Sequence, residues 1–496
     1  MEHGDQLKQD SSDLHKYGYA QQLYRDMGGF ANFAVSFTVI SILTGGIALF
    51  GHGLNYGGPV VNGIGWPIVT FFTLAVAASM AEIASAVPTA GAVYHWSALL
   101  GGPGWGWFTA WFNFIGQMAT TAGIDYGIAQ FVVDLMGWHG APVFLAVYAA
   151  LLLSQGLFNH YGIRAVARLN DFSVWYHIGV TVALVGAFLV LAELKPLSYA
   201  FTMTQNTHPV FSYRWAFLVG LLQAQWTLTG YDASAHITEE TMDPRRNAPW
   251  GMFIAVLVSG VFGYAMVLAM TLVIKDLPAA AAAPNAFIYV AEQALGARTG
   301  SLLTWAVLVA MWCCGLSSIT ANARMIFAFA RDGGLPDSKA LARVSPFYRT
   351  PATAVWLSVG LAFLLALTSG AFNVIVSFST IGLYISYILP VVLAMAARRR
   401  GAWGPGAKGE YPLGPWNLGA WGGLVNGVAI AWVLFITVLF VTPPNQVAGY
   451  TLAGVVLFLV VYYVAAVRGR FQGPKKMMTE EELLKMEQDL QKTSAY

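Results

Sequence analysis

Charged residues are scarce in this chain. Only 10% of its 496 residues are Asp, Glu, Lys or Arg, whereas 57% are hydrophobic, and an ordinary soluble domain is about 25% charged. The net charge of +2 gives no bulk field that would attract nucleic acid. The composition excludes an ordinary soluble domain and predicts a protein that crosses a lipid bilayer many times and has no nucleic-acid partner.

Cysteine is nearly absent, because Cys313 and Cys314 are the only two. They are adjacent within an apolar segment, so they form no disulfide framework and lack the spacing of a metal site. The nine histidines show no HExxH or comparable spacing, and no nucleophile elbow is present. We therefore expect apolar packing of the cysteines, no metal, no cofactor and no enzyme activity.

The apolar segments are long enough for an all-α polytopic membrane protein, since about 20 apolar residues cross a bilayer. Twelve transmembrane helices are predicted, at residues 30–56, 64–87, 104–136, 142–160, 171–194, 215–240, 249–274, 300–330, 352–369, 373–397, 418–441 and 446–467. The first 29 residues are polar, and no short apolar core with a cleavage site follows them. We therefore expect no signal peptide.

Basic residues are unevenly distributed over the loops between these spans. With the N-terminus inside, the outer loops hold only Lys195, Arg214, Lys275 and Arg298 of the 26 basic residues. Lys and Arg accumulate in cytoplasmic loops, which predicts a multi-pass protein of the cell membrane with both termini in the cytoplasm.

The sixth predicted span carries polar groups where a membrane helix normally has none. Residues 226–241 read WTLTGYDASAHITEET. Polar side chains and unpaired backbone at membrane depth are tolerated only where protein buries them or where they line a cavity. The interruption is therefore a candidate functional site.

The first predicted span has two adjacent glycines, Gly45 and Gly46, near its middle. Each costs up to about 1 kcal/mol relative to alanine in a helix, so the helix can open there; close packing of two helices is the alternative. Broken helices in corresponding positions of two inverted repeats indicate a transporter's binding site, and spans one and six are five spans apart. Half-helix ends suit the carboxylate and ammonium groups of a small zwitterion.

Three motifs resemble those of a known transporter family. They are GYDASAH at 230–236 followed by Glu239 and Glu240, EIASAVPTAGAVYHW at 82–96, and AFARDGGLP at 328–336. These residues resemble the amino acid/choline transporter group, which includes GABA permeases, within the amino acid-polyamine-organocation (APC) superfamily. Together with the span pattern, the resemblance covers residues 25–467.

The resemblance implies a secondary active transporter, a permease that imports amino acids, GABA, polyamines or choline by alternating access. It also implies a five-plus-five inverted-repeat (LeuT-like) core with broken helices 1 and 6, plus two peripheral helices. The chain then divides into a cytoplasmic tail (1–29), a transport core (30–397), a cytoplasmic linker (398–417), the peripheral helices (418–467) and a C-terminal tail (468–496) with at most one surface helix.

The resemblance also assigns the substrate site. It places the substrate's carboxylate near the backbone of residues 43–46 and its amine near the carbonyls of Trp226, Thr227 and Thr229. The predicted substrate-binding residues are Ser41, Ile42, Leu43, Thr44, Gly45, Gly46, Asp125, Trp226, Thr227, Thr229, Gly230, Tyr231 and Asp232. Thr229, Tyr231 and Asp125 make the pocket more polar than one for leucine or alanine, which favours GABA or another amino acid over choline or a polyamine.

Three of these residues have a second interpretation. Trp226 is either an aromatic gate over the substrate or an ordinary buried tryptophan. Asp232 either caps the second half-helix, since aspartate is a favoured N-cap, or attracts a cationic group or senses protons. Asp125, deep in the third span, either serves substrate or coupling or makes a structural hydrogen bond.

His177, deep in the fifth span, is the predicted proton-coupling residue. In proton-coupled relatives a basic side chain about 15 residues beyond a glycine like Gly162 takes the place of the sodium ion, and His177 has that spacing. An unperturbed histidine changes charge near physiological pH. The alternative is sodium held by Ser317, Ser318 and Thr320 in span eight, although such hydroxyls also bond across helix pairs.

Other polar residues are expected at the cytoplasmic side. Glu82 and His95 are predicted to belong to an inner gate, and Glu239 and Glu240 to be solvated or paired with Arg245 or Arg246 rather than to contact substrate. A non-transporting nutrient sensor and an ion channel are the competing functions. The short C-terminal tail argues against a sensor, and two broken helices at one site suit an occluding carrier better than a channel.

Overall fold

The computed structural model describes residues 3–161, 163–203, 211–367, 372–404, 413–474 and 479–494. Within these ranges the chain is helical, and its β-structure is one isolated bridge between Met27 and Thr241. The predicted all-α fold is therefore confirmed. Gly162, the reference point for the spacing of His177, lies outside the described residues.

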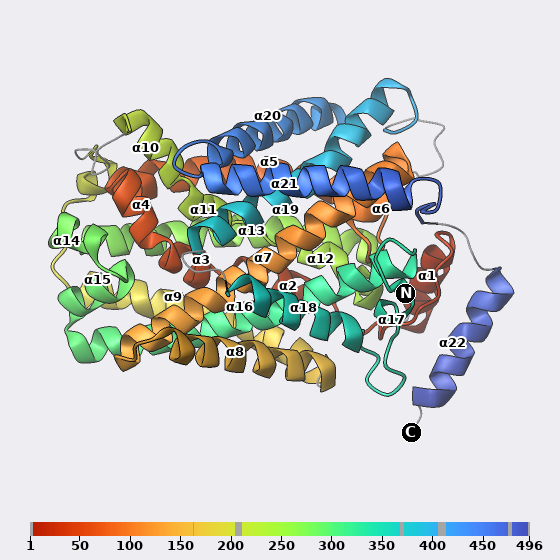
Figure 1. Ribbon diagram of the computed structural model, residues 1–496, viewed down its shortest axis with the longest axis horizontal. Coiled ribbons are helices and arrows are strands. Elements are labelled where there is room, and N and C mark those ends of the chain that lie inside the picture. The colour runs from red at the N-terminus through yellow and green to blue at the C-terminus, as the bar shows by residue number, and fades with distance from the viewer. Residues whose placement is uncertain are drawn as a thin grey trace.

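The long helices run side by side along the longest axis of an elongated bundle (Figure 1). One end holds both chain termini with α1 (His3–His15), α17 (Ser338–Leu341) and α22 (Glu480–Ser494), and we call it the terminal end. The opposite end holds α4 (Phe50–Tyr56), α10 (Tyr213–Gly220), α14 (Leu277–Ala282) and α15 (Ala286–Leu295).

Nine helical segments among the described residues are long and apolar enough to cross a membrane. They are Gly29–Ala48, Val61–Ala86, Ala141–Tyr161, Val166–Leu191, Pro244–Leu272, Ala297–Arg331, Phe372–Arg399, Gly419–Val441 and Gln446–Val467. The three other predicted spans are helical but more polar, broken or short: α7 (Pro103–Met136), the segment from α10 to α12, and α18 (Ala352–Leu365). The count of twelve stays a prediction.

The other helices have the following bounds. They are α2 (Gly29–Ile40), α3 (Ile42–Ala48), η1 (Val61–Gly65), α5 (Trp66–Ala86), α6 (Val93–Gly101), α8 (Ala141–Tyr161), α9 (Ile163–Leu191), η2 (Leu197–Phe201), α11 (Leu222–Thr227), α12 (Ala233–His236), η3 (Thr238–Glu240), α13 (Pro244–Leu272), α16 (Ala297–Arg331), α19 (Phe372–Arg399), η4 (Gly419–Trp421), α20 (Gly422–Val441), α21 (Gln446–Tyr462) and η5 (Tyr463–Val467).

The first predicted span breaks at Ser41, not at the glycine pair. Ser41 has a φ of 35° and separates α2 from α3, and such a left-handed residue ends the helical hydrogen-bond pattern. Gly45 and Gly46 lie within α3. A Cβ at Gly45 would lie 2.5 Å from Thr227 Oγ1 and 2.6 Å from Thr227 Cα. The expectation that the helix opens at Gly45 and Gly46 is therefore wrong, and close packing accounts for at least Gly45.

The sixth predicted span is interrupted where the sequence indicated. Helix α11 ends at Thr227, and α12 begins at Ala233. Between them Gly230 has a φ of 86°, a conformation that glycine adopts without the steric cost other residues meet. Each break therefore divides its own span into half-helices.

Residues before the first span pack against the terminal end. Tyr19, Leu23 and Met27 are buried, and the backbone N–H of Met27 donates to Glu240 O at 2.9 Å. At the other end of the chain, Glu487 of α22 lies 2.8 Å from His15 Nε2 of α1. Both chain ends therefore contribute contacts at this end of the bundle.

Candidate functional site

The two helix breaks lie side by side in the centre of the bundle. The Ser36 hydroxyl on α2 donates to the carbonyl oxygen of Tyr231 at 2.8 Å, and Ser234 Oγ donates to Ser36 Oγ at 2.7 Å. Gly230 is tightly packed against Val39, because a Cβ at Gly230 would overlap the valine side chain. The structure therefore brings together the two interruptions that the sequence predicted as partners.

The half-helix ends present backbone groups at these breaks. The first helical bonds of α3 run from the N–H groups of Thr44 and Gly45 to Ser41 O, so the N–H groups of Ile42 and Leu43 precede its first bonded turn. At the second break, Trp226 O accepts from Thr229 Oγ1 at 2.6 Å. These N–H and C=O groups have the polarity that a carboxylate and an amine require.

A small pocket lies between the breaks. Its volume is about 10 Å³, roughly the room of one water molecule. Its lining comprises Val39, Ile40, Thr44, Gly45, Thr120, Ile124, Trp226, Thr227, Thr229 and Cys314. Five predicted substrate residues are among them: Thr44, Gly45, Trp226, Thr227 and Thr229. In this conformation the pocket is too small for an amino acid.

A much larger cavity, of about 590 Å³, lies at the end of the bundle opposite the terminal end, where α4 and α15 contribute to its lining. Its lining includes His52, Tyr126, Gln130 and Phe372. The Trp226 ring lines the small pocket and stands edge-on to Phe372, with 6.3 Å between the ring centroids. Trp226 Nε1 also donates to Ser379 Oγ at 2.9 Å. Trp226 therefore lies between the pocket and the cavity.

The other predicted substrate residues are outside the lining of the small pocket as far as the structure describes it. They are Ser41, Ile42, Leu43, Gly46, Asp125, Gly230, Tyr231 and Asp232. Asp125 is fully buried and accepts from Gln155 Nε2 of α8 at 2.8 Å. A Cβ at Gly315 of α16 would lie 2.9 Å from Asp125 Oδ1. These contacts turn Asp125 towards α8 and α16, as the structural interpretation of this residue expected.

Asp232 stands at the N-cap position of α12, but its side chain makes no capping hydrogen bond. Its carboxylate instead accepts from Asn113 and Gln117 of α7 at 3.0 Å each and from the Tyr387 hydroxyl of α19 at 2.6 Å. His236 Nε2 is 3.1 Å away. The helix-cap interpretation is wrong for this side chain, because these four partners hold it instead.

His177 reaches the first break from α9. Its Nε2 is 2.8 Å from Ser41 Oγ, and its Nδ1 is 2.8 Å from the carbonyl oxygen of Ser173. Because that carbonyl can only accept, Nδ1 carries a hydrogen and Nε2 can accept from the Ser41 hydroxyl. The predicted coupling residue therefore contacts the break itself.

The three hydroxyls of the sodium alternative bond to three different helices. Ser317 donates to Asn170 Oδ1 of α9 and Thr320 to Asn159 Oδ1 of α8, both at 2.6 Å. Ser318 Oγ lies 2.7 Å from Thr121 Oγ1 of α7. Each hydroxyl thus has a partner, and the three join α16 to its neighbours.

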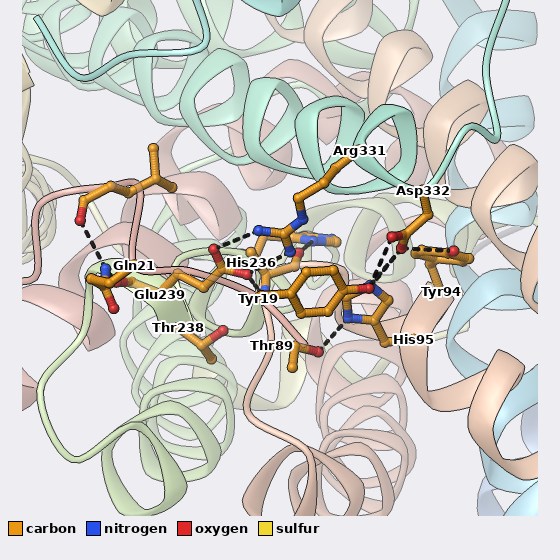
Figure 2. A network of polar contacts seen from close by, with 12 residues as sticks. Tyr19, Gln21, Thr89, Tyr94, His95, His236, Thr238, Glu239, Arg331 and Asp332 are labelled. Carbon is orange, nitrogen blue, oxygen red and sulfur yellow. Dashed lines mark hydrogen bonds and ion pairs between the residues drawn. The ribbon is translucent and has the colours of Figure 1, made fainter. Parts of the chain in front are cut away.

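A network of polar side chains lies at the terminal end (Figure 2). Glu239 pairs with Arg331 at 2.8 Å, and the Arg331 guanidinium lies 3.7 Å above the centroid of the Tyr19 ring. The Tyr19 hydroxyl donates to Asp332 at 2.8 Å, and His95 Nε2 lies 3.2 Å from the same carboxylate. We call these five residues the closing network.

The charge states of Tyr19 and Asp332 suit this arrangement. Burial, and then the negative charge of Asp332, raise the pKa of Tyr19 well above its ordinary value, so the phenol stays a donor. Burial alone would raise the pKa of Asp332, but the hydrogen bond and charge of His95 and the charge of Arg331 hold it below the ordinary value. Asp332 is therefore an ionised acceptor.

The sequence misplaced the partners of two acidic residues, Glu239 and Glu240. Glu239 pairs with Arg331 and Glu240 with Arg324 at 2.9 Å, so the expected pairing with Arg245 or Arg246 is wrong. Arg245 Nε instead donates to Ser85 O. Glu82 pairs with Arg398, whereas His95 joins the closing network. A usable signal was the spacing of Arg324 and Arg331: seven residues apart, they share one face of a helix.

The chain is similar to known permeases. Residues 28–465 match the family described as amino acid permease. The chain is 37% identical over 431 residues to the amino-acid permease BAT1 of Arabidopsis thaliana, covering 80% of this chain and 83% of that protein. It is 36% identical to the BAT1 homolog of Oryza sativa subsp. japonica (78% and 80% covered), and 25% identical to the GABA-specific permease of Saccharomyces cerevisiae (79% and 72% covered).

Proposed function

The chain belongs to the amino acid permease family of the APC superfamily, and from this premise we propose that it is a secondary active transporter that imports amino acids or related small amines by alternating access. The relatives are named permeases, so this is a family of membrane transporters and not of enzymes. GABA is the substrate we favour, because one relative is a GABA-specific permease and the pocket offers the hydroxyls of Thr44, Thr227 and Thr229.

The observation that best supports the proposal is the meeting of two helix breaks at one pocket. In the proposed complex the substrate's carboxylate lies against the first turn of α3, where N–H groups are unpaired within the helix. Its amine lies against the carbonyl groups of residues 226–229. Binding requires the pocket to expand from its present volume of about 10 Å³, with Trp226 moving as the gate.

The proposed fold has twelve transmembrane helices in a five-plus-five inverted-repeat core with two peripheral helices. We place the protein in the cell membrane with both termini, and so the terminal end, in the cytoplasm. The 590 Å³ cavity then faces outwards, and the closing network seals the inner side. This is the arrangement expected of a carrier that receives substrate from outside.

Proton coupling through His177 is the proposed energy source. Its contact with Ser41 supports this role, because a change of charge on the imidazole alters the hydrogen bond at the break. Transport measurements distinguish this proposal from four alternatives. They are sodium coupling, exchange, transport of choline or polyamines, and a non-transporting nutrient sensor.

Uptake into liposomes tests the proposal. A thermal-shift screen with amino acids, GABA, putrescine and choline identifies the ligand first, since a ligand at 100 times its Kd stabilises the folded state by about 2.7 kcal/mol. The purified protein is then reconstituted, and radiolabelled uptake is measured with a proton gradient, a sodium gradient or neither. Accumulation driven by protons is the expected result. If none of these compounds is accumulated or exchanged, the protein is not such a transporter.

A further inference from the structure

Asp232 and His236 form a buried pair one helical turn apart in the second break. Their side chains are fully buried, and His236 Nε2 lies 3.1 Å from Asp232 Oδ2. The other ring nitrogen, Nδ1, lies 3.1 Å from the carbonyl oxygen of Ala90, between α5 and α6. We propose that this pair is a proton-binding site whose proton holds the terminal end closed. The inference rests on the proposed proton-coupled transport and adds a second site to that of His177.

The hydrogen-bond partners determine how many protons the pair carries. The carbonyl of Ala90 can only accept, so His236 Nδ1 must donate to it. An ionised Asp232 can also only accept, so Nε2 must carry a hydrogen as well, and the ring is then an imidazolium. If the carboxyl group is protonated instead, the total is the same. In this conformation the pair therefore holds one proton more than a neutral histidine beside an ionised aspartate.

The surroundings of Asp232 favour the ionised form. Asn113, Gln117 and Tyr387 each donate a hydrogen bond to its carboxylate, and hydrogen bonds to an ionised acceptor are stronger than those to a neutral one. The same Tyr387 hydroxyl accepts from the N–H of Gly230 at 3.2 Å. The proton is therefore best placed on His236, and the carboxylate is tied to the break in the helix.

The side chains that face the pair from the neighbouring helices are tyrosines, neutral amides and charged residues that have other partners, and His95 lies beyond Ala90 in the closing network. Tyr387, Tyr231 and Tyr384 face Asp232, and even an unperturbed phenol is neutral at pH 7. Helix α2 contributes no charged residue, and α7 contributes two neutral amides. The charged residues of α16 and α13 at this end have other partners: Arg324 with Glu240, Arg331 with Glu239, Arg245 with Ser85 O and Arg246 with Asp243. The imidazole is thus the switching group.

Ala90 links the pair to the closing network. Its carbonyl accepts from His236, and its N–H donates to Glu239 Oε1 at 3.3 Å, while Glu239 pairs with Arg331. A neutral imidazole has a single N–H, so after proton loss His236 keeps either the contact with Asp232 or the contact with Ala90, but not both. The ionised carboxylate of Asp232 is the stronger acceptor, so the remaining N–H stays with it. Proton release therefore loosens α12 from Ala90 and favours opening of the terminal end.

The direction of this switch suits import. The protonated pair stabilises the closed terminal end, and the stabilisation is lost as pH rises through the pair's titration range. With the terminal end in the cytoplasm, opening on that side follows delivery of the proton to the more alkaline compartment. After substrate release the empty site takes up its next proton from the outer side, and this proton stabilises the closed terminal end again.

A thiol at position 90 tests the switch without any substrate. Ala90 is fully buried and takes part through its backbone alone, so Ala90→Cys preserves both contacts. The probe is a water-soluble maleimide, and the labelling rate in detergent is divided by the rate for the same variant unfolded in SDS at each pH. The chain without the added cysteine gives the background from the buried Cys313 and Cys314. We expect the ratio to rise by up to about tenfold per pH unit.

Further substitutions in the Ala90→Cys chain identify the group responsible. His236→Gln retains hydrogen bonding but cannot take up a proton, and we expect its labelling ratio to be independent of pH; Asp232→Asn gives the same result if His236→Gln does not fold. The matched control is His160→Gln, because His160 on α8 contacts Trp356 away from the breaks, and it keeps the pH dependence.

Three results would overturn the inference. They are a ratio that does not vary with pH in the Ala90→Cys chain, an unchanged pH dependence in His236→Gln, and a pH dependence that His95→Gln alone removes, which would assign the switch to the closing network. Because no substrate is present, these outcomes are separate from a failure of uptake in liposomes, which would contradict the proposed transport function.

Discussion

Ser41 Oγ and His177 Nε2 lie 2.8 Å apart, so the residue that breaks the first span is hydrogen-bonded to the one intramembrane histidine of α9. Ser41 also lies 2.6 Å from Thr44 Oγ1, and Thr44 lines the pocket. A short chain of polar atoms therefore connects the imidazole to the proposed substrate site. A protonated imidazole donates where a neutral one accepts, and the Ser41 and Thr44 hydroxyls must reorient in response.

His177→Ala tests this connection. We expect the variant to lose proton-driven accumulation and to keep exchange, because the pocket residues remain while the titrating group is gone. One pH unit of gradient supports up to about tenfold accumulation per proton, and the variant's ratio of inside to outside substrate should fall to about one. Radiolabelled uptake and counterflow in the same liposomes give both quantities. Accumulation equal to that of the unmodified chain would exclude His177 from coupling.

Gly45→Ala tests the close approach of the two breaks. The added Cβ would lie 2.5 Å from Thr227 Oγ1 and 2.6 Å from Thr227 Cα, so the half-helices must separate. We expect transport to fall by at least about tenfold, since a small displacement at a binding site has that effect. Uptake rate and protein yield are measured together.

Two further variants show whether a loss of transport in Gly45→Ala comes from this close approach. Thr227→Ser removes a methyl group but not the backbone atom, so it should not restore transport to Gly45→Ala. Gly427→Ala on α20 is the matched control, because a Cβ at Gly427 meets nothing within 4 Å. Full activity in Gly45→Ala would show that the packing of α3 on α11 is not needed for transport.

Sequence patterns located the two interrupted spans but not the residue at which the first one opens. The glycine pair indicated a weak helix, and weakness alone does not decide where a helix breaks. Gly45 lies within α3 and packs so close to Thr227 that no Cβ fits, whereas Ser41 takes a left-handed conformation next to Thr44 and His177. Those partners come together only in the folded bundle, so local propensity could not identify the break.

The partners within the closing network also could not be predicted from the local sequence. Glu239 was paired with its basic neighbours in sequence, but its partner Arg331 is 92 residues away on α16. Tyr19 was assigned to a tail because its surroundings are polar, and it is buried between Arg331 and Asp332. The apolar spans, in contrast, follow from composition and length alone, which explains why the fold class was accessible from the sequence.

Trp226→Ala tests the proposed gate between the small pocket and the 590 Å³ cavity. Removing the ring should raise the KM for the transported substrate and lower the uptake rate by at least about tenfold, because aromatic rings dominate the energetics of such contacts. Trp226→Phe keeps a ring but loses the hydrogen bond to Ser379, which is worth about 0.5–1.5 kcal/mol. We therefore expect an intermediate effect, and Ser379→Ala should match it. Equal KM values for Trp226→Ala and the unmodified chain would contradict a gating role.

Glu239→Gln tests whether the closing network holds the terminal end shut. Glu239 is fully buried and supplies both oxygens that Arg331 contacts, and removing one partner of a buried ion pair costs about 3–5 kcal/mol. If Arg331 and Glu239 separate when this end opens, that cost falls on the closed state alone. In the Ala90→Cys chain, the normalised labelling ratio should therefore rise by at least about 100-fold. Arg246→Gln is the control, since Arg246 is largely exposed and lies 4.0 Å from Asp243, an arrangement worth at most about 1 kcal/mol. Equal labelling in Glu239→Gln and Arg246→Gln would show that the ion pair stabilises the fold in both states and does not control opening.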